Sequence, residues 1–210
     1  MSGGVLFFRQ FLTRFGTTGA VAPSWHMLAR QLARDVGANR GGEPIKVFEA
    51  GPGTGSVTRE ILKKLDDGDR LVAYEVNSRF VDYLQEKIDR DPHINASRVS
   101  VSLVEGRAQD CDESSFDHAV CSIPFTNFLP QEVQIILESM MKNLKPGGTL
   151  SYFDYWGMGR LRGIMGGRAE RARMQAVDAV RNGFLEQYGT GQKLILLNLP
   201  PAIVRHCRKP

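Results

Sequence analysis

The stretch that decides the fold is residues 45–55, which read IKVFEAGPGTG. Its first five residues form a short apolar run typical of a buried strand, and a glycine-rich turn follows. Residues 56–65 then have the pattern of a helix. Glycines let the backbone turn tightly and approach a ligand closely, and a helix N-terminus favours negatively charged groups. The stretch therefore predicts a strand, a turn and a helix that together bind a small-molecule cofactor.

Strands and helices continue to alternate beyond this turn. The predicted strands are residues 71–75, 99–105, 116–122 and 149–155, and the predicted helices are residues 78–90, 130–144 and about 167–186. Parallel neighbours require crossover helices, which cover both faces of a sheet. Residues 192–208 predict an antiparallel hairpin around prolines at the sheet edge. The expected fold is α/β: a doubly wound, Rossmann-like, seven-stranded sheet, mostly parallel, with a C-terminal antiparallel hairpin and an N-terminal amphipathic helix.

The spacing of the glycine turn indicates the kind of cofactor. The pattern is ExGxGxG, whereas a dinucleotide site needs GxGxxG, and Ser56 stands where its third glycine would fall. The sequence has no GK[ST] to hold a triphosphate. Glu75 ends the next predicted strand, where a carboxylate can accept hydrogen bonds from both ribose hydroxyls. The spacing therefore favours an adenosyl cofactor.

This turn, the acid on the second strand and the KPGG turn at residues 145–148 together resemble the class I S-adenosylmethionine-dependent methyltransferases. The resemblance implies S-adenosylmethionine as cofactor, with Gly51 and Gly53 beneath its methionine part and Glu49 near its amino group. Residues 106–110, GRAQD, resemble the family's adenine loop, which leaves Gln109 or Asp110 to bond the adenine amino group. The cofactor-binding candidates are Glu49, Gly51, Gly53, Gly55, Glu75, Val76, Ala108, Gln109 and Ser122.

Composition sets bounds on the function. A chain of 210 residues with 42% hydrophobic and 24% charged residues predicts one globular domain. Three cysteines without CxxC spacing argue against a disulfide framework and against a metal site. No apolar run approaches the roughly 18 residues that span a bilayer. Residues 1–40 carry a net charge of +4 and residues 156–210 one of +7, which indicates a polyanionic partner, either a nucleic acid or an anionic membrane surface.

Nearly the whole chain resembles the bacterial phospholipid N-methyltransferases. The resemblance is carried by residues 11–24 (FLTRFGTTGAVAPS), 51–55 with Thr58, 124–128 (PFTNF) and 145–150 (KPGGTL). It implies methylation of the phosphatidylethanolamine headgroup and its methylated intermediates toward phosphatidylcholine. Ser122 stands where amino-group methyltransferases carry Asn or Asp. This difference weakens the interpretation that the methyl acceptor is the amine of a nucleobase.

The acceptor site is predicted at the end of the fifth strand and around an arginine cluster. Tyr155 and Trp156 are placed to border the reacting amine, because ligands bind at the carboxyl ends of parallel strands. Tyr155, Asp154 or His118 could accept the amine proton, and the first two are the catalytic candidates. The predicted substrate-binding residues are Phe125, Asn127, Phe128, Trp156, Arg160, Arg168 and Arg171, the last two sharing one helical face.

The N-terminus predicts a membrane contact. As a helix, residues 5–15 gather phenylalanines on one face and arginines on the other, which suits an interfacial helix, although a lid packed on the sheet has the same pattern. The membrane-binding candidates are Phe7, Phe8, Arg9, Phe11 and Arg14. We expect residues 1–40 to form this membrane-binding and substrate-lid segment and residues 41–210 the methyltransferase domain.

The favoured reading is a monomeric cytoplasmic enzyme, peripherally bound to the inner face of the cell membrane, without metal or nucleic acid. Two alternatives stay open. One is an enzyme that methylates the adenine N6 position of ribosomal RNA, because phospholipid N-methyltransferases resemble that family. The other is a non-catalytic module that keeps a cofactor pocket to bind membranes or partners.

Overall fold

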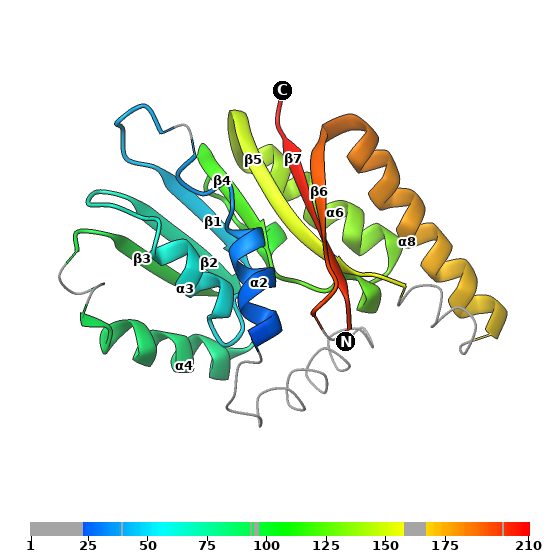
Figure 1. Ribbon diagram of the computed structural model, residues 1–210, viewed down its shortest axis with the longest axis horizontal. Coiled ribbons are helices and arrows are strands. Elements are labelled where there is room, and N and C mark those ends of the chain that lie inside the picture. The colour runs from blue at the N-terminus through cyan, green and yellow to red at the C-terminus, as the bar shows by residue number, and fades with distance from the viewer. Residues whose placement is uncertain (1–22, 39, 93, 95–96, 158–166, 199) are drawn as a thin grey trace.

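The computed structural model describes residues 23–38, 40–92, 94, 97–157, 167–198 and 200–210 of the chain. Seven strands form one sheet in the order β3-β2-β1-β4-β5-β7-β6 (Figure 1). Strands β1 to β5 pair in parallel, whereas β7 pairs antiparallel with both β5 and β6. This arrangement confirms the predicted doubly wound sheet with its C-terminal hairpin.

The elements follow the predicted alternation. The strands are β1 (Lys46–Ala50), β2 (Arg70–Glu75), β3 (Ser100–Glu105), β4 (Phe116–Cys121), β5 (Leu144–Tyr155), β6 (Gly189–Ile195) and β7 (Ala202–Arg208). The helices are α2 (Pro23–Leu32), α3 (Ser56–Leu62), α4 (Ser78–Asp89), α6 (Pro130–Asn143) and α8 (Gly167–Tyr188), with short 3-10 helices η1 (Ala108–Asp110) and η2 (Phe125–Asn127).

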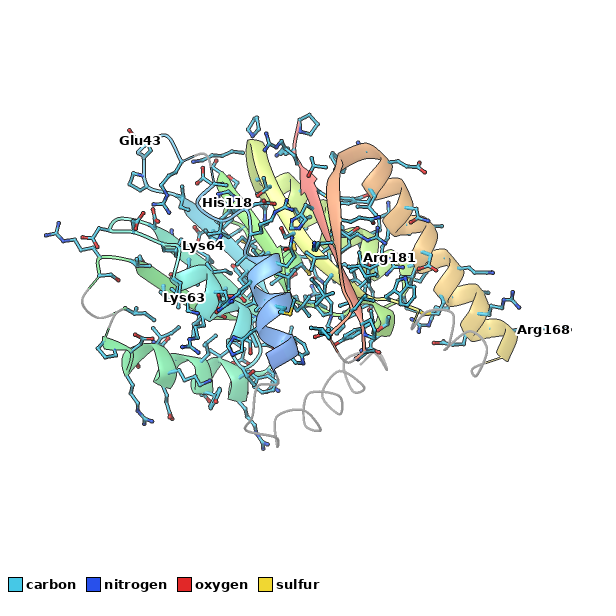
Figure 2. All side chains as sticks on the ribbon, in the orientation of Figure 1. Glu43, Lys63, Lys64, His118, Arg168 and Arg181 are labelled. Carbon is cyan, nitrogen blue, oxygen red and sulfur yellow. The ribbon has the colours of Figure 1, made fainter. Side chains whose placement is uncertain are left out.

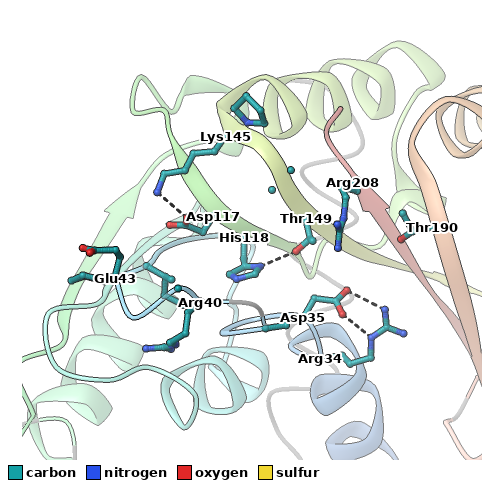
Figure 3. Close-up of a pocket in the computed structure, with 17 residues that line it drawn as sticks. Arg34, Asp35, Arg40, Glu43, Asp117, His118, Lys145, Thr149, Thr190 and Arg208 are labelled. Carbon is teal, nitrogen blue, oxygen red and sulfur yellow. Dashed lines mark hydrogen bonds and ion pairs between the residues drawn. The ribbon is translucent and has the colours of Figure 1, made fainter.

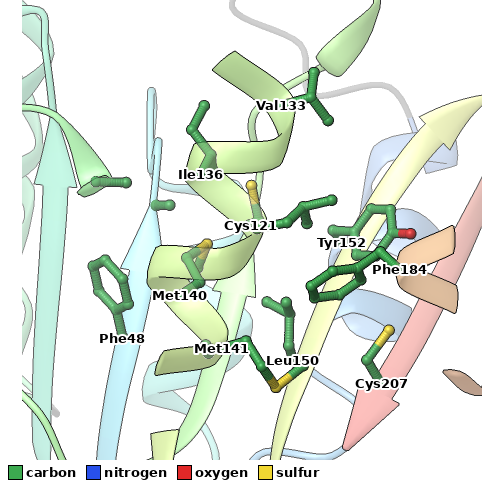
Figure 4. Close-up of a cluster of buried hydrophobic side chains, with 14 of the residues drawn as sticks. Phe48, Cys121, Val133, Ile136, Met140, Met141, Leu150, Tyr152, Phe184 and Cys207 are labelled. Carbon is green, nitrogen blue, oxygen red and sulfur yellow. The ribbon is translucent and has the colours of Figure 1, made fainter. Parts of the chain in front are cut away.

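Helices cover both faces of the sheet. On one face α6 and α8 enclose a core that includes Phe48, Leu137 and Tyr152, all fully buried (Figure 4). On the other face α2 and α3 enclose a second core, in which Leu28 and Phe153 are buried. Burial on both faces explains why the central strands are apolar almost throughout.

Two boundaries differ from the prediction. Strand β5 begins at Leu144 rather than Thr149, because the predicted turn at residues 145–148 lies inside the strand as an irregularity in its pairing with β4. Strand β6 ends at Ile195, so Leu196 and Leu197 belong to the turn that follows. Apolar character alone placed these two leucines in the strand.

The predicted N-terminal segment lies partly outside the described residues. The described part of it includes α2, which packs against α3, β5, β6 and β7 and contributes Leu28, Ala29 and Leu32 to the core. The predicted interfacial helix, with Phe7, Phe8, Arg9, Phe11 and Arg14, is not among the described residues. Within the described part of the chain, no helix is both long and apolar enough to cross a bilayer.

Candidate cofactor and acceptor site

The glycine turn lies where the strand order reverses. Strand β1 has β2 on one side and β4 on the other. The strand order therefore reverses at β1, and the turn after Ala50 lies at this point. The Gly51 N–H donates to Tyr74 O (2.9 Å) and the Ser122 N–H donates to Ala50 O (2.9 Å). Ligands bind at such a switch point in open α/β sheets. The tertiary structure therefore places the turn where the sequence predicted a cofactor.

The three glycines of the turn have positive φ angles but different surroundings. A Cβ at Gly51 would lie 2.7 Å from Ile123 Cγ1, and a Cβ at Gly55 would lie 2.5 Å from Leu84 Cδ1. A Cβ at Gly53, where φ is +56°, would meet no protein atom within 4 Å. Positive φ and a close side chain thus both disfavour a Cβ at Gly51 and Gly55, whereas the space beside Gly53 is open.

Two buried carboxylates flank this turn. Glu75 accepts hydrogen bonds from the Gly53 N–H (3.1 Å) and the Asn77 N–H (3.0 Å), so it fixes the turn from the end of β2. A carboxylate has about four acceptor sites, which leaves acceptors on Glu75 for ribose hydroxyls. Burial raises the pKa of Glu75 above its ordinary value.

Glu49 is completely buried, and neither of its carboxylate oxygens has a hydrogen-bond partner among the described residues. Burial raises the pKa of Glu49 to about 8; the nearby Thr58 hydroxyl partly offsets this rise, and the Glu75 charge adds to it. A buried acceptor without a partner is costly, which suits a site completed by a cationic ligand. These residues fit S-adenosylmethionine: Glu49 would face its amino group and Glu75 its ribose. When bound, the cofactor supplies an activated methyl group.

The predicted adenine side is only partly enclosed. Ala108 is buried, Gln109 is half-buried, and Val76 is 45% exposed. Arg107 donates two hydrogen bonds of 2.7 Å to the Asp110 carboxylate. Because this pair already engages Asp110, Gln109 is the better placed of the two candidates to bond an adenine amino group. Ser122, also predicted here, has a buried hydroxyl without a hydrogen-bond partner among the described residues.

The loop after β4 is anchored from both sides. Phe125 is 1% exposed and packs on Tyr152 at 5.7 Å between ring centroids, so its visible role is in the core. Asn127 and Phe128 are half-buried. Arg173, from α8, donates to Phe128 O (2.6 Å) and to Thr126 O (3.0 Å). Sequence reasoning placed Arg173 in an arginine cluster but gave it no role; Glu170, three residues earlier, was the signal.

The two candidate proton acceptors each have a structural role. Tyr155 is 7% exposed, packs on Phe153 at 5.2 Å, and has its pKa raised by burial. Asp154 is buried and forms ion pairs with Arg181 of α8 and Arg205 of β7. Proton acceptance by either residue stays a prediction, and Arg181 is a partner that the sequence pattern did not reveal.

The predicted substrate-binding residues lie in different parts of the structure. Trp156 is 56% exposed at the end of β5. Arg168 and Arg171 are exposed on the first turns of α8, and Arg168 points away from the sheet at the tip of this helix (Figure 2). Arg160 lies outside the described residues.

A cavity of about 340 Å³ lies at the other end of the central strands, away from the glycine turn (Figure 3). It is lined by ion pairs, including Arg34 with Asp35 and Lys145 with Asp117. His118 lines it too, 2.8 Å from Thr149 Oγ1. His118 lies in the first half of β4 and pairs with Val47, near the start of β1. It therefore lies away from the carboxyl ends of the strands, where Asp154 and Tyr155 are found.

Comparisons with known proteins agree with this geometry. Residues 48–150 match the profile of a family described as a methyltransferase domain. The chain is 27% identical over 154 residues to the ornithine lipid N-methyltransferase of Singulisphaera acidiphila, covering 70% of this chain and 74% of that protein. It is 35% identical over 89 residues to ribosomal RNA small subunit methyltransferase A of Phenylobacterium zucineum, covering 40% of this chain and 28% of that protein.

The fold has solved counterparts. N-methyltransferase NodS from Bradyrhizobium japonicum, in complex with S-adenosyl-l-homocysteine, has a TM-score of 0.68 at 16% identity, covering 96% of this chain and 97% of that one. The chain spans half or less of three curated relatives, whose names specify ribosomal RNA, transfer RNA and malonyl-[acyl-carrier protein]. The chain has the fold of class I S-adenosylmethionine-dependent methyltransferases, and residues 48–150 match a methyltransferase domain. The cofactor of this class is S-adenosylmethionine, as the glycine turn predicted.

Binding of S-adenosylmethionine is expected to strengthen as pH rises from 6 to 7.5. Without a ligand, Glu49 is mostly protonated at pH 7 because its pKa is about 8. A cationic amino group favours the carboxylate, so binding releases a proton, and affinity should rise by up to about tenfold per pH unit. Calorimetry across this range measures the effect. Glu49→Gln, which cannot ionise, should bind more weakly and with a flatter pH dependence; parallel curves would contradict the assignment.

Proposed function

We propose that this methyltransferase N-methylates the ethanolamine headgroup of a phospholipid and its methylated intermediates, toward phosphatidylcholine. The observation that carries the proposal is a group of exposed apolar side chains at the carboxyl ends of the strands, where the glycine turn also lies. We call this group the apolar tip; it consists of Trp156, Leu196 and Leu197. These side chains are 56%, 63% and 71% exposed. Because β7 runs antiparallel to β5, the β6–β7 turn lies at the carboxyl ends of the parallel strands, where the glycine turn also lies.

The apolar tip is held in place by specific contacts. The Trp156 N–H donates to Pro201 O (2.7 Å), which joins the end of β5 to the β6–β7 turn. Asn198 is fully buried and its side-chain amide donates to Pro200 O (2.7 Å). Exposed leucines on a fixed turn beside an exposed tryptophan suit the interface of a bilayer.

A basic side chain also lies near the apolar tip. Lys193 is exposed on β6, two residues before this strand ends at the turn. Basic side chains next to apolar ones are attracted to anionic lipid. The ornithine lipid N-methyltransferase supports the same class of substrate, because the alignment covers more than two thirds of both proteins.

The chemistry needs a deprotonated amine held in line with the donor methyl. Methyl transfer gains most from positioning, with reacting atoms at about 3–3.5 Å. Each methylation moves the nitrogen toward a permanent cation, which aromatic faces stabilise by about 0.5–2 kcal/mol. Tyr155 and Trp156 would serve this role, Arg168 and Arg171 would contact the lipid phosphate, and residues 1–15 would bind the membrane.

The acceptor is tested directly with labelled S-adenosylmethionine. The protein is incubated with vesicles of phosphatidylethanolamine and phosphatidylglycerol, with ornithine lipid, or with ribosomal RNA. Label in phosphatidylethanolamine supports the proposal. Label in RNA alone would overturn it in favour of adenine methylation, which the ribosomal RNA methyltransferase relative keeps as the second candidate.

Replacing Leu196 and Leu197 with serine is expected to weaken vesicle binding by about 100-fold or more, since each buried leucine contributes about 1.5–3 kcal/mol and about 1.4 kcal/mol is a factor of ten. Cosedimentation with anionic vesicles measures the loss. Ile135→Ser is the matched control, because Ile135 is 52% exposed on α6. Equal losses in both variants would show that the apolar tip has no special role.

A further inference from the structure

One guanidinium joins α8 to the loop that follows β4. Arg173 donates through one terminal nitrogen to Phe128 O (2.6 Å) and through the other to Thr126 O (3.0 Å). Glu170 accepts from the same group at 2.9 Å and 2.6 Å, so the guanidinium is held on both sides. The Arg173 side chain is only 21% exposed. Four charge-assisted hydrogen bonds in a fork geometry fix position more firmly than a lysine can.

The loop held by Arg173 begins beside the cofactor turn. Ile123, at its start, contacts the place where Gly51 lacks a side chain. Phe125 anchors its middle in the core, and the two carbonyls bonded to Arg173 lie on either side of Asn127. The position of Asn127 relative to the glycine turn is therefore set from one side by the core and from the other by α8.

We propose that Arg173 is the positioning residue of the acceptor site, which fixes residues 126–128 so that the acceptor nitrogen meets the donor methyl in line. The inference rests on the proposed function in taking this loop as the border of the acceptor. It also joins two parts of that site, because the helix that carries Arg168 and Arg171 is the one that holds the loop. Arg173 thereby sets the spacing between the bound phosphate and the amine.

Arg173→Lys is the test, because lysine keeps the charge but cannot bridge two carbonyls and a carboxylate in one plane. We expect kcat with phosphatidylethanolamine micelles to fall about 10- to 100-fold, since small misplacements cost this much. The affinity for S-adenosylmethionine should stay within about twofold, because Arg173 has no contact with the glycine turn. Glu170→Gln should lower kcat in the same direction but less.

Hydrogen exchange separates this inference from the proposed substrate. The amides of residues 126–128 should exchange about tenfold faster or more in Arg173→Lys, whichever acceptor the enzyme uses. Arg90→Lys is the control, because Arg90 also pairs with a glutamate, Glu86, but on the exposed surface of α4. Unchanged exchange, or an unchanged kcat with faster exchange, would overturn the positioning role. Failure of lipid labelling in the wild type would instead overturn the proposed function.

Discussion

Gly53→Val is expected to weaken S-adenosylmethionine binding by about 100-fold or more while the protein stays folded. A Cβ at residue 53 would meet no protein atom within 4 Å, so the added side chain would extend into the open space where we expect the cofactor to bind. The Gly53 N–H can still donate to Glu75, since the substitution leaves the backbone groups in place. Calorimetry gives the affinity, and circular dichroism with urea denaturation gives the fold and its stability.

Backbone strain is the other effect of this substitution, and Gly147→Val controls for it. Gly147 has φ +76° and an equally open Cβ direction, but it lies in β5 far from the glycine turn. Both variants should lose about 1–2 kcal/mol of stability from the left-handed backbone. Only Gly53→Val should lose cofactor affinity. Equal cofactor affinity in the two variants would remove Gly53 from the site.

Asp154→Ala is expected to destabilise the protein by up to about 3–5 kcal/mol, because it removes the buried carboxylate that Arg181 and Arg205 share and leaves them only the more exposed Asp178 and Gln192. The Asp154 and Arg181 side chains are 7% and 15% exposed, and Arg205 approaches the same carboxylate at 3.7 Å. Three elements, β5, α8 and β7, meet through this carboxylate. Urea denaturation measures the loss, which would make stability the main effect of a residue predicted to be catalytic.

Asp178→Ala is the matched control for Asp154→Ala. Asp178 also pairs with Arg181, but its side chain is 45% exposed, so its removal should cost about 0–1 kcal/mol. Asp154→Leu combined with Arg181→Leu should recover most of the loss, because the buried ion pair is then removed as a whole, while Arg205 keeps its hydrogen bond to Gln192. If Asp154→Ala instead kept full stability and lost kcat, the proton-acceptor role would be supported.

Much of the fold could be predicted because it depends on local sequence. Strand β1, the glycine turn and α3 follow from residues that adjoin one another in the chain. Errors came where local pattern was insufficient: Leu196 and Leu197 look like strand residues, but β6 ends where its pairing with β7 ends. The turn at residues 145–148 lies inside β5 for the same reason, since pairing with β4 resumes beyond it.

Some residues of the candidate site could be predicted from local sequence, and others depend on contacts between distant parts of the chain. The cofactor residues were predicted from the fixed spacing of a glycine turn and from an acid at the end of the next strand. The carbonyls bonded by Arg173 lie 45 and 47 residues away along the chain. Asp154 and Arg181 meet only because α8 packs over β5. No local pattern encodes such contacts, because spacing along the chain does not specify which side chains a helix brings to a strand.

The sequence by itself determined the alternation of strands and helices, the kind of cofactor and the edge of the sheet at which it binds, since each follows from periodicity or from a short motif. Only the tertiary structure decided that side chains crowd Gly51 and Gly55 and that the space beside Gly53 is open. It also decided that Asp154 is engaged by arginines and that Arg173 holds the acceptor loop. The physical reason is that burial and hydrogen bonding are set by neighbours in space, which chain packing brings together from distant positions.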